Sequence, residues 1–305
     1  MSWDSDRPRV SIGMPVYNGE PYVQEALDAI LTQTFSDFEL VVSDNASTDS
    51  TPEIVRDYAN RDRRIRYERS PVNRGASRNY WRALELSRGP YFRWAAADDL
   101  SGPQSLERCV EVLDRDPEVI LAYPSTRFID GEGNVTRSYD DGLDLPDDRP
   151  SDRFARLRQN LGRCNAIFGL MRREVLEQTG PLGSYMGSDI VLLGELALHG
   201  RFREVPEASF YRRMHEAAFS GKTEEEQQAF YEPGSGRATY WREWRHLGEH
   251  LRAAARAPIP AAEKGRVAAR VIRSAIADRD GLARELIHGM RLWLQDLSSS
   301  SGTDG

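Results

Sequence analysis

Three short polar segments each follow an apolar stretch that is typical of a buried strand. They are residues 15–18 (Pro-Val-Tyr-Asn), 44–49 (Asp-Asn-Ala-Ser-Thr-Asp) and 97–99 (Ala-Asp-Asp). The adjacent carboxylates of Asp98 and Asp99 are hard oxygen ligands suited to Mg²⁺ or Mn²⁺, and Tyr17 adds an aromatic ring to the first segment. Each segment alone is more often a structural or solvated turn, because Pro, Asn and Asp are common turn residues. Their chemistry therefore depends on whether the fold brings them together.

The first hundred residues alternate strand-like and helix-like patterns, which predicts a mostly parallel sheet flanked by helices. We expect strands at residues 9–14, 38–43, 65–68 and 91–95, the first ended by Pro15, and helices at 23–31, from Thr51 onward and at 77–86. In an open sheet of this kind, ligands bind beyond the carboxyl ends of the strands. The three polar segments are therefore expected along one edge of one sheet.

Beyond residue 100 the order of the elements changes. We expect a helix at 106–113, a strand at 119–123, a turn at 131–134, a surface loop at 140–152, a buried helix at 190–199 and short strands at 202–205 and 209–214. A polar stretch at 222–236 precedes two expected helices, which a Pro-Ile-Pro break at 258–260 separates. Residues 298–305 are expected to be a disordered tail.

The bulk composition narrows the class of protein. A formal net charge of −7 argues against nucleic-acid binding, which usually requires a strongly basic domain. Cys109 and Cys164 are too few for a disulfide framework, and no CxxC spacing exists for zinc. No apolar run approaches the length of a membrane span, and residues 1–6 lack the basic start and apolar core of a secretory signal. We therefore expect a cytoplasmic protein, either free or peripheral at the inner face of the membrane.

The carboxyl-terminal segment has its own charge balance. Residues 237–297 hold 12 Arg or Lys against 7 Asp or Glu, and they include Trp241, Trp244 and Trp293. This composition is compatible with docking on an anionic membrane surface. Packing on the chain's own domain, or on a second copy in a homo-oligomer, is commoner, and we favour packing.

A series of ordered motifs resembles the family-2 glycosyltransferases of the GT-A fold over about residues 8–220. They are VSIGMPVYN at 10–18, LVVSDNASTD at 40–49, NRGASRN at 73–79, and the Asp98-Asp99 pair with the later YRRMH at 211–215. The resemblance implies an α/β GT-A domain at residues 1–230, with a nucleotide-binding half at about 8–100 and an acceptor half at about 101–230. Residues 231–297 would then be a helical segment outside the resemblance.

The resemblance also implies a reaction. A sugar would pass from a nucleotide diphosphate donor, with a UDP- or dTDP-sugar favoured, to an acceptor hydroxyl with inversion at the sugar carbon. The acceptor would be a glycan, a lipid-linked molecule or a small molecule. The expected cofactor is a divalent cation, Mn²⁺ or Mg²⁺, which neutralises the charge of the departing diphosphate.

Roles for single residues follow from the same resemblance. Tyr17 would stack on the base, Asp44 would accept its imide N–H, Arg78 would reach the base or the phosphates, and Asp98 would bind the ribose. The full expected nucleotide-binding set is Pro15, Tyr17, Asn18, Asp44, Asn45, Gly75, Arg78 and Asp98. For Tyr17 and Arg78 the alternatives are ordinary packing and a plain surface charge.

The remaining roles concern the metal and the proton. Asp99 and His215 are the expected metal ligands, and Arg213 would add positive charge beside the diphosphate. Asp189 is the expected general base, which takes the proton from the acceptor hydroxyl. The alternative for Asp189 is an acid favoured by the helix dipole, and for His215 it is a histidine satisfied on a loop. Glu195 is the reserve candidate for the base, although it lies in mid-helix.

Three other classes of protein compete with this interpretation. A non-catalytic scaffold that binds nucleotide sugars and partners an active paralogue would keep the same motifs, but the intact Asp pair and Asp189 argue against it. A sugar-1-phosphate nucleotidyltransferase would open with a Gly-rich phosphate loop, where this chain has residues 15–18 instead. A dinucleotide oxidoreductase would need GxGxxG after its first strand, and that motif is absent from the sequence.

Overall fold

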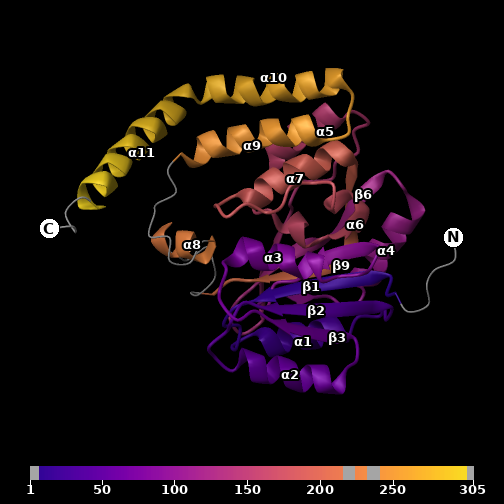
Figure 1. Ribbon diagram of the computed structural model, residues 1–305. Coiled ribbons are helices and arrows are strands. Elements are labelled where there is room, and N and C mark those ends of the chain that lie inside the picture. Colours follow the sequence, from indigo (N-terminus) through magenta and orange to yellow (C-terminus); the bar gives the residue numbers. More distant parts are fainter. Residues whose placement is uncertain (1–6, 216–223, 232–240, 301–305) are drawn as a thin grey trace.

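The computed structural model describes residues 7–215, 224–231 and 241–300, and within them one nine-stranded sheet has helices on both faces (Figure 1). The strands follow the order β3-β2-β1-β4-β8-β6-β9-β5, and β7 pairs with β6. The α/β fold that the alternating pattern predicts is therefore confirmed.

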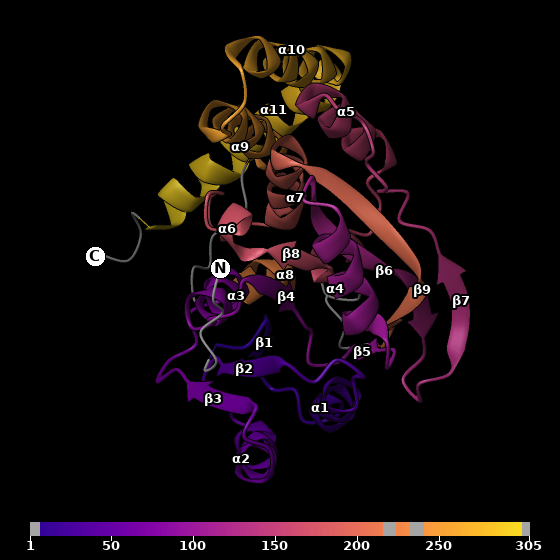
Figure 2. The same ribbon diagram turned by 90° about the vertical axis from the view of Figure 1, so that its right-hand side faces the viewer.

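The amino-terminal half supplies four parallel strands in the order β3-β2-β1-β4. They are β1 (Val10–Val16), β2 (Phe38–Asp44), β3 (Ile65–Arg69) and β4 (Tyr91–Trp94), joined through α1 (Val23–Leu31), α2 (Thr51–Arg61) and α3 (Ala76–Glu85). Helices α1 and α2 cover one face of these strands and α3 covers the other (Figures 1 and 2). Every strand and helix expected in this half is present, with ends shifted by one or two residues.

One expectation for this half is wrong, because Pro15 lies inside β1 opposite Ser43 and does not end the strand. The bond from Ala95 N–H to the carbonyl of Gly13 shows that the odd-numbered residues here face β4. The pairing with β4 stops at Gly13, so the missing N–H of Pro15 loses no sheet bond.

The second half departs further from the expected pattern. Its elements are β5 (Leu100–Ser101), α4 (Ser105–Arg115), β6 (Val119–Ile129), β7 (Val135–Tyr139), α5 (Pro150–Asn160), η1 (Asn165–Phe168), β8 (Leu170–Arg172), α6 (Arg173–Leu176), α7 (Ser188–His199) and β9 (Arg201–Arg213). Strand β6 runs six residues beyond the expected 119–123, and the two expected short strands are one strand, β9, which pairs with β6 in parallel. Helix α5 was not expected and begins inside the predicted surface loop. The turn expected at 131–134 does join β6 to β7.

Four helices follow in the carboxyl-terminal part that the structure describes. They are α8 (Glu224–Tyr231), which lies within the expected polar stretch, α9 (Arg242–Arg256), α10 (Ala261–Ala277) and α11 (Arg279–Ser300). The sequence predicted two helices after that stretch, whereas α9, α10 and α11 make three. Helix α11 extends to Ser300 and so enters the expected tail, while residues 301–305 lie outside the described part.

These helices pack on their own domain, as we favoured. A separate hydrophobic cluster joins Phe154 of α5 and Leu198 of α7 to Ala254 of α9 and to Val267 and Val271 of α10. The cluster buries one side of α9 and α10 against α5 and α7. In the described ranges, none of the helices is both long and apolar enough to span a bilayer.

Candidate functional site

The loop after β1 is tied to the loop after β2. Asn18 adopts a left-handed backbone conformation with φ of 54°, which Asn tolerates better than most residues. Its Oδ1 accepts the N–H of Thr48 at 2.8 Å, and its own N–H donates to Oγ of Ser47 at 2.9 Å. Tyr17, the residue before it, is 49% exposed. The two hydrogen bonds of Asn18 therefore join the loops, and the ring of Tyr17 stays accessible to a ligand.

Asp44 ends β2 and is fully buried. Its Oδ1 accepts the N–H of Ser47 at 2.8 Å, while its Oδ2 accepts the hydroxyl of Tyr67 at 2.5 Å and Nε of Arg69 at 3.2 Å. Burial and the bond to Asp44 raise the pKa of the Tyr67 hydroxyl. Three donors thus already occupy the carboxylate that we expected to bind the base. A carboxylate accepts about four hydrogen bonds, but Asp44 is fully buried, so contact with a base requires a neighbouring side chain to move.

Asn45 holds the turn that opens α3. Its Oδ1 accepts the N–H of Arg74 at 3.0 Å, and its Nδ2 donates to Oδ1 of Asn73 at 2.7 Å and to the carbonyl of Gly75 at 3.2 Å. Gly75 has φ of 84°, a conformation that strains any residue with a side chain. Asn45 and Gly75 therefore shape the turn from which α3 projects.

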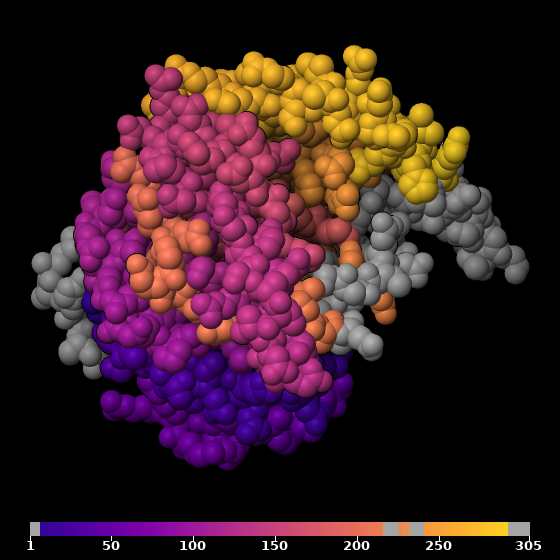
Figure 3. Space-filling view, turned by 180° about the vertical axis from the view of Figure 1, so that it is seen from behind, coloured from indigo at the N-terminus to yellow at the C-terminus, as the bar shows by residue number. Residues whose placement is uncertain are grey.

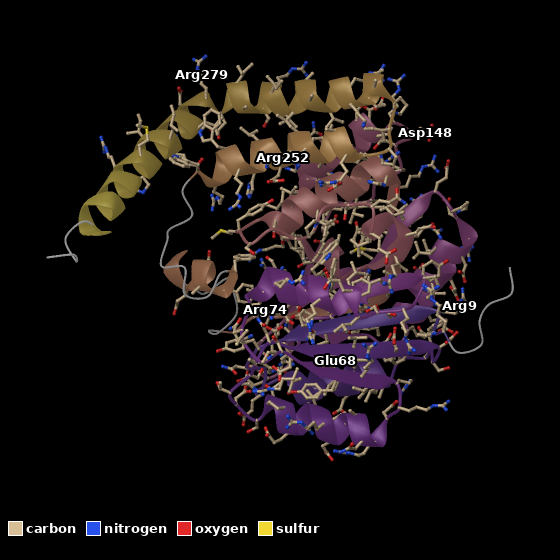
Figure 4. All side chains as sticks on the ribbon, in the orientation of Figure 1. Arg9, Glu68, Arg74, Asp148, Arg252 and Arg279 are labelled. Carbon is tan, nitrogen blue, oxygen red and sulfur yellow. The ribbon has the colours of Figure 1, made fainter. Side chains whose placement is uncertain are left out.

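Arg78 lies on the exposed side of α3, where its Nη1 is 3.4 Å from Oε1 of Glu85. This contact turns Arg78 along the helix and away from the strand ends. Arg78 also lines a cavity of about 330 Å³, and Asn45, Arg74 and Arg82 form other parts of its wall. Figure 4 labels Arg74, which lies at the amino-terminal end of α3. The cavity touches none of Tyr17, Asp44, Asp98 and Asp99, so it lies beside the predicted site.

The Asp98-Asp99 pair follows β4 and faces the end of β9. The pairing of Leu100 with Tyr211 brings the two segments together. Oδ1 of Asp99 accepts the N–H of Arg213 at 2.8 Å, and Oδ2 of Asp98 lies 3.1 Å from Nε2 of His215. Burial, followed by the charge of Asp98, raises the pKa of Asp99 well above that of an ordinary aspartate. His215 thus contacts the residue that we assigned to the ribose.

This edge suits a divalent cation by its donors and its charge. Two adjacent carboxylates repel each other there, as the raised pKa of Asp99 indicates, and a cation would relieve that repulsion. No group of three or more His, Cys, Asp or Glu side chains in the described ranges is arranged to hold a metal. Mg²⁺ and Mn²⁺ commonly take one or two carboxylates and complete their shell with phosphate oxygens and water. The residues fit a cation that binds together with a diphosphate.

Arg213 has a different place from the one we expected. Its side chain is fully buried beside α1, with Nη2 at 2.6 Å from Oε2 of Glu25 and the guanidinium carbon 4.5 Å from the ring centroid of Tyr22. The same guanidinium donates to the backbone carbonyls of Asp98, Asp130 and Gly131. Arg213 therefore fastens the Asp98-Asp99 loop, and its donors are already engaged.

We expect Arg213→Met to lower the free energy of unfolding by about 3 kcal/mol, because buried carbonyls lose their donor. Urea unfolding measures the change. Arg212→Met is the matched control, since the side chain of Arg212 leaves β9 on the side opposite to that of Arg213 and is only partly buried, so its loss is expected to affect stability less. Equal losses for the two variants would contradict the role assigned to Arg213.

Arg212 joins the two halves of the site. Its Nη1 donates to the carbonyl of Arg163 at 2.9 Å and to Oδ1 of Asn165 at 2.6 Å. Its charge opposes the rise in pKa that burial causes in both Asp99 and Asp189. The guanidinium is therefore close to both the predicted metal ligand and the predicted base.

Asp189 stands in the first turn of α7, where its Oδ1 accepts the N–H of Ile190 at 3.0 Å. Burial raises its pKa, and bonds from the backbone and from Cys164 offset part of the rise. Tyr80 of α3 lies nearby on the donor side, since burial and then the charges of Asp98 and Asp99 raise the pKa of its hydroxyl. Burial, and then the charge of Asp189, raise the pKa of the Tyr231 hydroxyl on α8. One site thus includes α3, α7, α8 and the ends of β4 and β9.

Sequence reasoning missed Arg212 and Tyr80. Arg212 stands inside the YRRMH motif, but a strand sends neighbouring side chains to opposite faces, and Arg213 was chosen. Glu195, the reserve base, accepts two bonds of 2.7 Å from Arg256 of α9 and one from the N–H of Gly180. Glu195 is buried and forms an ion pair with Arg256, so it connects α7 to α9 and does not face the site.

Comparison with known proteins bears on this arrangement. The model of the family described as glycosyl transferase family 2 matches residues 11–180, more than half of the chain. An uncharacterised glycosyltransferase of Methanocaldococcus jannaschii is 34% identical over 143 residues, covering 46% of this chain and 49% of its own. Chondroitin synthase of Escherichia coli is 33% identical over 128 residues, or 42% of this chain and 18% of its own. The chain thus spans about half, or less, of the length of these relatives.

Solved structures share the fold at low sequence identity. Residues 1–349 of Staphylococcus aureus TarS, in complex with UDP-GlcNAc, superpose with a TM-score of 0.68 at 17% identity, over 92% of this chain and 79% of that one. The mannosyltransferase PcManGT of Pyrobaculum calidifontis, in complex with GDP-Man and Mn²⁺, gives a TM-score of 0.51 at 20% identity, over 97% and 90%. The fold and the family that the motifs predict are both confirmed: the chain is a member of glycosyl transferase family 2 with a GT-A fold.

Proposed function

We propose that the protein transfers a sugar from a nucleotide diphosphate donor to an acceptor hydroxyl, with inversion at the sugar carbon. The observation that carries this proposal is that Asp99, at the end of β4, and Asp189, at the start of α7, both lie within electrostatic reach of Arg212. An inverting transfer needs a diphosphate site and a base on opposite faces of the reacting sugar carbon, and carboxylates near one cationic side chain are candidates for both roles. The donors named in the solved complexes, UDP-GlcNAc for TarS and GDP-Man for PcManGT, support a nucleotide sugar.

The donor would lie across the ends of β1, β2 and β4. Tyr17 is exposed and stacks on the base, and Asp98 binds the ribose. We keep a UDP- or dTDP-sugar as the favoured donor, with Asp44 as the imide acceptor after Arg69 has moved aside. Asn18, Asn45 and Gly75 act by shaping the loops around the nucleotide, and Arg78 reaches it by leaving Glu85.

Asp99, with Asp98 and His215 beside it, would hold Mn²⁺ or Mg²⁺ against the donor diphosphate. When bound, the cation supplies a Lewis acid that neutralises the charge of the leaving group. We assign the additional positive charge beside the diphosphate to Arg212, because the guanidinium of Arg213 is buried elsewhere. Asp189 takes the proton of the acceptor hydroxyl as that oxygen attacks the sugar carbon.

Donor binding is testable without knowing the acceptor. At a concentration of about 100 times its dissociation constant, the right nucleotide sugar is expected to raise the melting temperature by about 5 °C. The measurement is a thermal-shift panel of UDP-, dTDP- and GDP-sugars, each with and without Mn²⁺. A shift that is equally large without metal would contradict the cation site, and no shift with any nucleotide sugar would contradict the donor class.

The alternative function, a scaffold that binds a nucleotide sugar without catalysis, makes a different prediction. A transferase without its acceptor hydrolyses its donor slowly in the presence of metal, whereas a pure binding protein does not. Release of nucleoside diphosphate from the donor that gives the largest thermal shift therefore decides between them. The variant Asp189→Asn provides the blank, because it retains the proposed donor site.

A further inference from the structure

Helices α10 and α11 carry large apolar side chains on the side that faces away from the protein. The set comprises Ile272 (51% exposed) and Ile276 (61%) on α10, with Ile287 (53%) and Met290 (50%) on α11, while Leu286 (41%) borders it one turn after the buried Leu282. We call these residues the α10–α11 apolar face. Figure 3 shows the two helices, in yellow, forming the top surface of the molecule.

Helix α10 has both an inner and an outer apolar side. Val267 and Val271 are buried against α5 and α9, and the carboxylate of Glu263 accepts the N–H of Ser151 at 2.9 Å. Ile272 and Ile276 lie on the opposite side of the helix, because residues one and five positions after Val271 are turned away from it. A helix packed on one side only normally has a polar outer side, so the outer isoleucines need another explanation.

Helix α11 repeats this arrangement. Leu282 is buried, and the carboxylate of Glu285 accepts the N–H of Glu243 on α9 at 2.9 Å. Gly289 is also buried, and its Cα lies against the ring of Trp241. Ile287 and Met290 point to the other side, where they are about half exposed. The inner side of each helix therefore packs against the protein, whereas the outer apolar side is exposed.

Basic residues accompany the apolar face. Residues 261–291 hold seven Arg or Lys against four Asp or Glu, in a chain whose net charge is −7. Arg273, Arg284 and Arg291 are exposed, and in residues 7–215, 224–231 and 241–300 the structure gives them no ion-pair partner. Figure 4 places Arg279 at the junction of the two helices, directed away from the protein. The surface is thus apolar and cationic together.

We propose that the α10–α11 apolar face docks on an anionic lipid surface. Ile276 and Ile287 would enter the boundary between headgroups and acyl chains, and Arg284 and Arg291 would lie at the lipid phosphates. A second copy of this chain, paired about a two-fold axis, would place the same arginines opposite each other. The acidic remainder of the chain is repelled by an anionic membrane, so attraction is confined to this face and orients the protein.

Vesicle co-sedimentation tests the proposal with the full chain and without any sugar donor, so its outcome is independent of the proposed transferase function. The vesicles contain phosphatidylcholine alone or with about 30% phosphatidylglycerol. We expect binding only to the anionic vesicles, with a loss on raising the salt concentration. The double variant Ile276→Ser, Ile287→Ser is expected to bind them roughly tenfold more weakly. The variant Arg284→Gln, Arg291→Gln is expected to fall roughly tenfold on anionic vesicles.

Val135→Ser is the matched control, since Val135 on β7 is 54% exposed and lies outside the apolar face. It is expected to bind as the unaltered protein does, and melting temperatures check that each variant folds. Absence of binding to anionic vesicles, or equal binding by the double isoleucine variant, overturns the proposal. So does a dimer in light scattering that the isoleucine substitutions dissociate, because the face would then serve a second copy.

Discussion

Asp99→Asn is expected to lower the rate of sugar transfer by about a thousandfold, since a cation that stabilises the leaving diphosphate contributes several kcal/mol to the reaction. The side chain of Asn keeps an oxygen that can accept the N–H of Arg213, which Oδ1 of Asp99 accepts at 2.8 Å. The substitution therefore removes the charge while it preserves the loop. The measurement is single-turnover transfer at saturating donor over a series of Mn²⁺ concentrations.

The control for this variant is Asp57→Asn. Asp57 is an exposed carboxylate on α2 paired with Arg61, so the substitution changes the net charge equally without touching the sheet edge. It is expected to leave transfer unchanged. Asp99→Ala with full donor turnover in added Mn²⁺ would show that the cation does not depend on this residue. A metal requirement that moves to higher Mn²⁺ concentration in Asp99→Asn would support the assignment directly.

Much of the donor side of the site could be predicted because it depends on local rules. Each polar segment directly follows a buried strand, and parallel strands bring their carboxyl ends to one edge. Tyr17, Asp98 and Asn45 reach that edge for this reason alone. The motif that begins α7 likewise placed Asp189 at a helix start, which the structure has. What these residues bind there stays a prediction.

Other features depend on contacts between distant parts of the chain. Alternation along β9 puts Arg212 and Arg213 on opposite faces, but only the position of Glu25 and Tyr22 on and before α1 decides which one is buried. The three donors on Asp44 come from its own loop and from β3, and the register between β2 and β3 sets two of them. No pattern within a single segment contains that information.

The missed elements have similar causes. Strand β9 continues past Pro206 because the register against β6 shifts between Pro124 and Ser125, which accommodates the extra residues. Helix α5 has few apolar residues, so its sequence resembled the acidic loop before it. Arg153 gives it a buried anchor by donating to the carbonyls of Ala197 and Leu198. These compensations are tertiary, and sequence periodicity does not contain them.

Asp189→Asn is expected to lower transfer by about a hundredfold to ten-thousandfold, the range that a positioned base contributes. Donor affinity should not change, because Asp189 lies in the first turn of α7 and is not one of the residues assigned to the donor. The raised pKa of Asp189 also predicts a pH dependence. The base is active only when ionised, so the rate is full above that pKa and falls as the pH drops through it. In Asp189→Asn this acidic limb of the profile should disappear.

The raised pKa of Asp189 also predicts that Asp189→Asn does not destabilise the fold, so a lower transfer rate in this variant would not come from unfolding. A carboxyl group whose folded pKa lies above its unfolded value binds its proton more tightly in the folded state. Folding stability therefore falls as the pH rises through that window, and the ionised Asp189 destabilises the protein at neutral pH. Asp189→Asn is then expected to melt at the same temperature or slightly higher.

Glu53→Gln serves as the matched control, because Glu53 is an exposed acid in the first turn of α2. It removes the same favourable interaction with a helix dipole, at a place far from the proposed base, and should leave the pH profile unaltered. If Asp189→Asn instead loses donor binding and keeps single-turnover chemistry, the base is another residue and Asp189 is a first-turn acid. A full rate with an intact acidic limb would lead to the same conclusion, since a positioned base acts on the transfer step itself.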